Sequence, residues 1–215
     1  MRWCVLCIAF AWAVGCGGSG GGEAAAGPVQ GSIVGRPFTA KGVAAANGVG
    51  TCSAPGLFEN RPMAVLHIHL DAHRDLAYMT DPANACPPLY KSTESLEVDL
   101  WSHAAGASPT FAPGVYTIHQ DGTGGLAVWV AHLDDACAQI LPNPMADSGT
   151  LTLTESDANH VRGAMSFRFD DGSGVAGAFD APILFSANAC GFMGLGGGPG
   201  EDPVCPQPLR CTAAP

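Results

Sequence analysis

The fold is decided by residues 161–179, which read VRGAMSFRFDDGSGVAGAF. On either side of a central turn, apolar side chains fall on one face of an extended chain: Val161, Met165, Phe167, Phe169, Val175 and Phe179. Such alternation is typical of a strand with one buried face. The run DDGSG at residues 170–174 supplies Asp, Gly and Ser where the turn is needed. The segment therefore predicts a β-hairpin whose register is set by its apolar face.

Shorter alternating runs continue this pattern along the chain. They lie at residues 64–71, 96–101, 126–131 and 150–154. Gly, Pro, Asn and Asp separate these runs, as turn residues do in all-β domains. Helical spacing is clearest over residues 133–141, ahead of Pro142, and predicts one short helix at most. We therefore expect an all-β domain, an antiparallel β-sandwich of about seven or eight strands, with a small β-barrel as the alternative.

The start of the chain has the pattern of an export signal. Arg2 precedes an apolar run from Trp3 to Val14, and Cys16 follows after small residues. The run is too short to span a bilayer as a helix, so residues 1–15 are predicted to be a signal peptide. The segment resembles the lipobox of bacterial lipoproteins. This resemblance implies that Cys16 becomes the first residue, carries the lipid and anchors the protein to a membrane of the bacterial cell envelope.

Two neighbours of Cys16 bear on the expected location. Gly17 stands where Asp would signal inner-membrane retention in that family, so the resemblance favours the outer membrane. Ala13 stands where the family usually has Leu, which leaves secretion without a lipid as the alternative.

The rest of the chain divides into three parts. Residues 16–28 are the lipidated cysteine and a flexible Gly-rich tether, residues 29–190 the β-sandwich domain, and residues 191–215 a tail rich in Gly and Pro. Cys4 and Cys7 lie in the signal peptide. Without these two and the lipidated Cys16, six of the nine cysteines are left. An even number of cysteines in an exported chain favours disulfides, but it does not determine which cysteines pair. The candidates are Cys52, Cys86, Cys137, Cys190, Cys205 and Cys211.

A second resemblance covers most of the chain after the signal peptide. Its short fragments, in order, are GSIVG at 31–35, PGVY at 113–116, SGTLTL at 148–153 and GAFDAP at 177–182. This order is similar to that of predicted bacterial lipoproteins of unknown function. The resemblance implies a compact β domain on a lipid tether and brings no known activity.

Charge and aromatic residues restrict the partners. Nine Lys and Arg stand against 19 Asp and Glu, which gives a formal net charge of −10. Phosphates repel such a chain, so we expect no nucleic-acid partner. The partners still compatible with this charge are another envelope protein or a glycan. A glycan would bind to the rings of Trp101 and Trp129 if these rings are exposed. Packing of both rings is the favoured interpretation.

Candidate metal ligands are concentrated in HIHLDAH, residues 67–73. On a strand, His67, His69, Asp71 and His73 point to one face, and imidazoles with a carboxylate are good ligands for zinc or copper. The spacing is close to the H-x-H-x-D-H of metallo-β-lactamase-like hydrolases, but the last histidine is displaced by one residue. That layered fold also needs alternating strands and helices, which this chain lacks. Histidines on the solvent face of a half-buried strand explain the same pattern, and this interpretation is favoured.

No set of titratable residues has motif-level support as nucleophile, base or oxyanion stabiliser, so no catalytic residue is expected. The pairs Asp134-Asp135 and Asp170-Asp171 fit turns and caps. The sequence thus favours a non-catalytic binding or structural module of the cell envelope. The alternative is a metal-binding or metal-dependent envelope protein that uses His67 and His69.

Overall fold

The computed structural model describes residues 27–54, 58–73, 89–90, 94–103, 108–121, 124–138, 140, 143–188 and 211–212. These residues form strands, turns and irregular segments and contain no helix. The strands are β1 (Gln30–Ile33), β2 (Arg36–Thr39), β3 (Gly42–Ala54), β4 (Phe58–Asp71), β5 (Leu89–Tyr90), β6 (Glu94–Ser102), β7 (Gly114–Thr117), β8 (His119–Asp121), β9 (Gly124–His132), β10 (Ala146–Ser156), β11 (His160–Phe169), β12 (Gly174–Asn188) and β13 (Cys211–Thr212).

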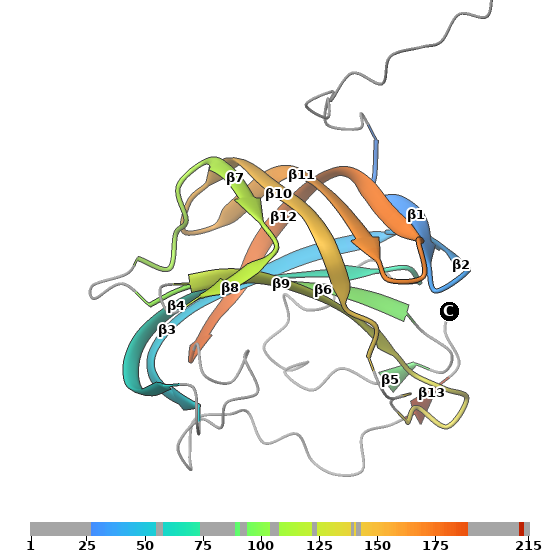
Figure 1. The fold of residues 1–215 in the computed structure, drawn as a ribbon, viewed down its shortest axis with the longest axis horizontal. Coiled ribbons are helices and arrows are strands. Elements are labelled where there is room, and N and C mark those ends of the chain that lie inside the picture. The colour runs from blue at the N-terminus through green and yellow to red at the C-terminus, as the bar shows by residue number, and fades with distance from the viewer. Residues whose placement is uncertain are drawn as a thin grey trace, which may run out of the picture.

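Two layers share the long strand β12 (Figure 1). One sheet has the order β7-β10-β11-β12-β3-β4-β6-β9-β8, and β1, which also pairs with β2, is attached to β12. The first half of β12 pairs antiparallel with β11, with Ala181 opposite Val161. Its second half pairs parallel with β3, with Ile183 opposite Ala45. Strand β12 therefore carries the sheet from the upper layer of Figure 1 into the lower one.

The sheet also comes close to closing on its other side. Trp129 of β9 forms an isolated antiparallel bridge with Met145, and the N–H of Val130 donates to the carbonyl of Pro144 at 2.9 Å. Strand β10 begins at the next residue, Ala146. The result is a nearly closed, barrel-like sheet. The predicted all-β class is confirmed, and the parallel β12–β3 pair is the departure from a purely antiparallel arrangement.

The core lies between the two layers. The lower layer contributes Leu66, Ile68, Leu70, Leu96, Val98, Leu100, Leu126, Val128 and Val130. The upper layer contributes Leu151, Leu153, Val161, Met165, Phe167, Phe169, Val175 and Phe179. Successive side chains of a strand point to opposite faces, so the residues between these apolar positions face away from the core. On β4 and β6 those intervening residues include histidines and carboxylates.

The hairpin predicted over residues 161–179 is confirmed. Phe167 lies opposite Val175 across β11 and β12, and both side chains are buried. Oδ1 of Asp171 accepts hydrogen bonds from the N–H and the hydroxyl of Ser173. Gly172 has a φ of 81°, a left-handed conformation that glycine adopts without steric cost. The turn chemistry read from the sequence is therefore the chemistry that reverses the chain.

The short helix considered over residues 133–141 is wrong. Oδ1 of Asp134 instead accepts hydrogen bonds from the N–H groups of Ala136 and Ala138, which makes a side-chain-stabilised turn. Cys137 follows with a φ of 59°, which a right-handed helix cannot contain. The hydrogen bonds of Asp134 thus favour a turn over the helix that the apolar spacing predicts.

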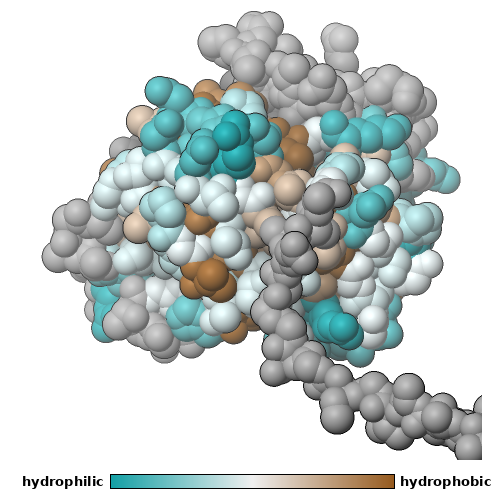
Figure 2. Space-filling model, turned by 90° about the horizontal axis from the view of Figure 1, so that it is seen from above, coloured by the Kyte–Doolittle hydropathy of each residue, from teal (hydrophilic) through white to brown (hydrophobic). Residues whose placement is uncertain are grey.

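The outer face of the upper layer is polar and exposed. Seen from above in Figure 2, its hydrophobic residues form separate patches among pale and hydrophilic ones. Arg162 bridges three strands there: its Nη2 lies 2.8 Å from Oδ2 of Asp180, and its Nη1 3.0 Å from Oε2 of Glu155. His160 contacts the same Asp180. This exposed ion-pair cluster contrasts with the buried one on the lower layer.

Several sequence predictions fall on residues outside the described ranges. They include the signal peptide 1–15, Cys16 and most of the tether 16–28, so cleavage and lipidation stay predictions. Cys137 is disulfide-bonded, while the pairing of the six candidate cysteines stays a prediction. In the tail 191–215, β13 pairs parallel with β5. Among the described residues, no helix is long and apolar enough to cross a membrane.

Candidate metal centre

Two neighbouring strands place histidines opposite carboxylates. In the β4–β6 ladder, His67 lies opposite Asp99 and His69 lies opposite Glu97. Their sequence neighbours Leu66 and Ile68 point into the core, so strand alternation sends the four polar side chains to the outer face of the lower layer. The arrangement is therefore a consequence of strand register, because directly opposed residues bring their side chains within reach of each other.

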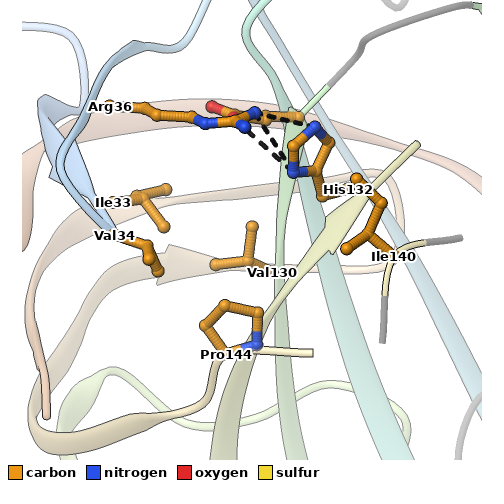
Figure 3. Close-up of a pocket in the computed structure, with 8 residues that line it drawn as sticks. Ile33, Val34, Arg36, Val130, His132, Ile140 and Pro144 are labelled. Atoms are coloured by element: carbon orange, nitrogen blue, oxygen red, sulfur yellow. Dashed lines mark hydrogen bonds and ion pairs between the residues drawn. The ribbon is translucent and has the colours of Figure 1, made fainter. Parts of the chain in front are cut away.

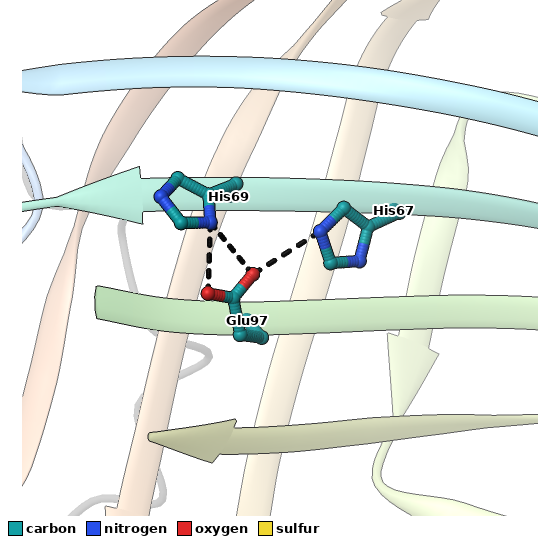
Figure 4. Close-up of side chains that lie close together, drawn as sticks. All are labelled: His67, His69 and Glu97. Carbon is teal, nitrogen blue, oxygen red and sulfur yellow. Dashed lines mark hydrogen bonds and ion pairs between the residues drawn. The ribbon is translucent and has the colours of Figure 1, made fainter. Parts of the chain in front are cut away.

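The four side chains form a continuous network, of which Figure 4 shows His67, His69 and Glu97. His67 donates from Nδ1 to Oδ1 of Asp99 at 2.7 Å, and its Nε2 lies 3.1 Å from Oε2 of Glu97. Nδ1 of His69 lies 2.8 Å from each carboxylate oxygen of Glu97. The hydroxyl of Ser95 donates to Oε1 of Glu97 at 2.6 Å. Glu97 is thus the centre of the network, with both imidazoles turned toward it.

The network is largely removed from solvent. Asp99 is 0 % exposed, and the side chains of His67 and His69 are 18 % and 20 % exposed. The adjacent strand positions hold small residues: Ala46 lies opposite His67 on β3, and Ala127 lies opposite Asp99 on β9. These buried alanines leave space beside the larger polar side chains. Burial of this kind is costly for charged groups unless they are paired, as these are.

Pairing shifts the pKa of both histidines upward. Burial alone lowers the pKa of His67, but hydrogen bonds to Asp99 and Glu97 outweigh it and raise the pKa to about 10. Burial likewise opposes charge on His69, whereas the charge and the hydrogen bond of Glu97 raise its pKa to about 9. Near neutral pH, both imidazoles of the metal-free site therefore carry an extra proton.

The carboxylates respond in opposite directions. Burial raises the pKa of Glu97, but the charge of His69 and the hydrogen bonds of both histidines outweigh burial and hold the pKa well below its usual range. Burial raises the pKa of Asp99 above its usual value, although His67 opposes this shift. Glu97 is accordingly the permanently charged partner of the two imidazoles.

Three atoms of this network have the arrangement of a metal-binding set. One ligand atom each of His67, His69 and Glu97 lies within 4.8 Å of the others. In a tetrahedral zinc site, ligands at about 2.0–2.1 Å from the ion stand about 3.3 Å apart. The distances of 2.8 and 3.1 Å from Glu97 to the imidazole nitrogens are slightly shorter. An ion in place of the protons would therefore lengthen these two contacts slightly.

Asp99 supplies the supporting contact that metal-binding histidines usually have. A ligating imidazole commonly donates its second N–H to a carboxylate, which fixes the ring and raises its basicity. His67 donates from Nδ1 to Asp99, and its Nε2 points to Glu97 (Figure 4). Oδ2 of Asp99 is buried and has no hydrogen-bond partner among the described residues. An unpaired buried oxygen beside the cluster is consistent with a site that gains charge compensation from a cation.

The structure brings together two of the four predicted ligands. His67 and His69 belong to the cluster, and their interpretation as solvent-facing residues is wrong, because both are mostly buried. Oδ2 of Asp71 lies 3.9 Å from Nε2 of His69, and Oδ1 of Asp71 accepts the backbone N–H of His73. Strand β4 ends at Asp71, so His73 lies beyond the alternating positions. Asp71 therefore caps the end of the strand and only approaches His69.

Sequence reasoning missed Glu97 and Asp99 as partners. Both occupy the polar positions of the alternating run 96–101, which is the available signal. What was missing was the pairing of that strand with the strand that bears the histidines. Trp101, on the same face of β6, is only 7 % exposed, so the expectation of glycan binding through exposed Trp101 and Trp129 loses its first ring.

No family model, no curated protein and no solved structure matches this chain.

Proposed function

We propose that this protein is an exported, lipid-anchored envelope protein that binds a divalent transition metal through His67, His69 and Glu97. The observation that carries the proposal is the convergence of these three side chains from two adjacent strands, with Asp99 behind His67. Two imidazoles and one carboxylate form a set that suits zinc or copper.

We assign binding rather than catalysis to this site. Two histidines and a glutamate also occur in catalytic zinc sites, where a fourth position stays open to water and substrate. Here the three ligand side chains are 10 to 20 % exposed. Such limited access favours a retained ion over an exchanging substrate.

Metal content tests the site. The full chain, purified without chelators and equilibrated with one equivalent of zinc or copper, is expected to retain about one ion after desalting. His67→Gln/His69→Gln is expected to lose it. His160→Gln is the matched control, because His160 also pairs with a carboxylate but lies in the exposed cluster of the upper layer.

Folding has to be followed in parallel. A melting curve recorded in chelator separates loss of the ligands from loss of the fold in the double variant. A wild-type chain that retains no ion, and whose melting curve is the same with zinc, copper or chelator, would contradict the proposal. The network would then be a buried ion-pair cluster of the sheet.

The anchor requires its own experiment. Labelled palmitate is expected to enter the wild-type chain in a bacterial host and not the Cys16→Ser variant. Absence of label from both chains, with cleavage retained, would support secretion without a lipid instead.

A further inference from the structure

A cavity opens at the mouth of the barrel-like sheet, separate from the candidate metal centre. It has a volume of about 290 Å³ and lies between the turn after β1 and the ends of β6 and β9 (Figure 3). Its wall is mostly apolar, formed by Ile33, Val34, Val130, Ile140 and Pro144. Small-molecule sites commonly occupy the mouths of β-barrels and measure about 300–1,000 Å³, so this cavity suits a small ligand.

One cation stands at the edge of this apolar wall. Nη1 of Arg36 donates to Oε1 of Glu94 at 2.9 Å and lies 2.8 Å from Nε2 of His132. Glu94 and His132 face each other across β6 and β9, and both contact Nη1 of Arg36; Figure 3 shows the contact with His132. Within the described part of the chain, Nε and Nη2 of Arg36 make no hydrogen bond. This edge of the guanidinium offers two parallel donors, the geometry that a carboxylate accepts.

The apolar rim includes a residue held in an unfavourable conformation. Val34 has a φ of 48°, in the left-handed region that a β-branched residue seldom adopts. The hydroxyl of Ser173 accepts its N–H at 3.0 Å. Val34 remains 49 % exposed, and Ile140 remains 43 % exposed. Glycine or asparagine would suit the turn better, so the backbone does not explain a valine at this position, which lines the cavity.

We propose that this cavity binds a small aliphatic carboxylate. The carboxylate pairs with the Nε–Nη2 edge of Arg36, and the aliphatic chain covers Val34 and Ile140. The carboxylate alone does not bind tightly, because the side chain of Arg36 is 57 % exposed and water competes with an isolated anion for its donors. Contact of the aliphatic chain with the apolar wall adds to the binding free energy of the ion pair. The ion pair and the apolar contact together define the class of ligand.

Calorimetric titration of the full chain with three probes tests this proposal. Hexanoate combines charge and chain, hexanol keeps the chain, and acetate keeps the charge. Saturable binding of hexanoate is expected, with hexanol and acetate at least about tenfold weaker. Arg36→Lys is expected to weaken hexanoate by about tenfold or more, since lysine lacks the planar fork. Arg168→Lys, an exposed arginine on β11, is the matched control.

A second variant distinguishes the cavity from the fold. Val34→Gly removes both the strain and part of the apolar rim. It is expected to raise the melting temperature while weakening hexanoate several-fold. The proposal is overturned if hexanoate fails to saturate, if Arg36→Lys binds it as tightly as the wild type, or if hexanol binds equally well.

Discussion

His67 and Asp99 are 32 positions apart in the chain, yet Nδ1 of the imidazole lies 2.7 Å from Oδ1 of the carboxylate. The contact exists because the two residues are directly opposed in the β4–β6 ladder. It uses one nitrogen of the ring and leaves Nε2 turned to Glu97. In the proposed metal site, Asp99 would therefore orient His67 and would not compete with it for the ion.

Asp99→Asn tests that orienting role. The amide keeps the shape of the side chain and can still accept a hydrogen bond, but it loses the negative charge. Zinc affinity is expected to fall by about ten- to a hundredfold, the usual effect of altering such a supporting contact. Competition with a chromophoric chelator measures this change. Asp147→Asn, at an exposed position of β10, is expected to leave the affinity unchanged.

Metal binding should be strongly pH-dependent. The pKa of His67 is raised to about 10 and that of His69 to about 9, so an entering ion displaces one proton from each imidazole. Affinity is expected to rise by up to about a hundredfold per pH unit below pH 9, the limit set by release of two protons. Titrations at several pH values, and in buffers of different ionisation enthalpy, count the protons. A pH-independent affinity would show that the imidazoles are not the ligands.

The stability of the metal-free chain is expected to have a pH dependence of its own. The pKa of each histidine is raised on folding, so its pairing stabilises the metal-free fold fully below the ordinary value of 6.5. This contribution is lost as pH rises toward 9 or 10. The pKa of Glu97 is lowered, so its contribution is complete above 4.5 and is lost as pH falls. The melting temperature in chelator is therefore expected to be highest between pH 4.5 and pH 6.5, where both contributions are complete.

The double variant His67→Gln/His69→Gln serves as the control for that profile. It lacks both titrating imidazoles, so its melting temperature should decline much less between pH 6.5 and 9. Equal declines in the two proteins would assign the pH dependence to other groups.

The strands could be predicted from the sequence because one face of each is buried in a single core. Alternation then records which side chains point inward, as in Leu66 and Ile68 on β4. The same pattern recorded that His67 and Glu97 point outward. It did not record that β4 and β6 pair with these two residues close together, because register across strands depends on the whole sheet. The two histidines could be predicted from their spacing within one strand. Their partners Glu97 and Asp99 could be identified only once the pairing of the two strands was known.

The mistaken helix has a related cause. Apolar spacing over residues 133–141 is a weak signal, and a single local hydrogen-bonding residue can overrule it. Asp134 binds two backbone N–H groups, which commits the chain to a turn before a helix can start. His73 shows the same limit, since the strand ends two residues before it.

Gly163 is predicted to be essential for the packing of the upper layer. A β-carbon at this position would lie 2.0 Å from the carbonyl oxygen of Thr152 and 3.1 Å from the ring of Phe179. Gly163→Ala is expected to reduce the free energy of unfolding by about 1–3 kcal/mol, because β10 must move away. Chemical denaturation measures the loss. Gly114→Ala is the control, since its nearest neighbours would be 4.0 Å away.

The long strand β12 has a consequence for how the chain reaches its native state. Asn47 on β3 accepts a hydrogen bond from the hydroxyl of Ser186 on β12, 139 positions later. Until β12 is in place, β3 is the unpaired edge of its half of the sheet and is open to pairing with other chains. Contacts so distant in sequence form slowly, because a large loop must close before they are made. A chain synthesised from its N-terminus onward would therefore expose this strand edge to aggregation until β12, near its C-terminal end, has been made.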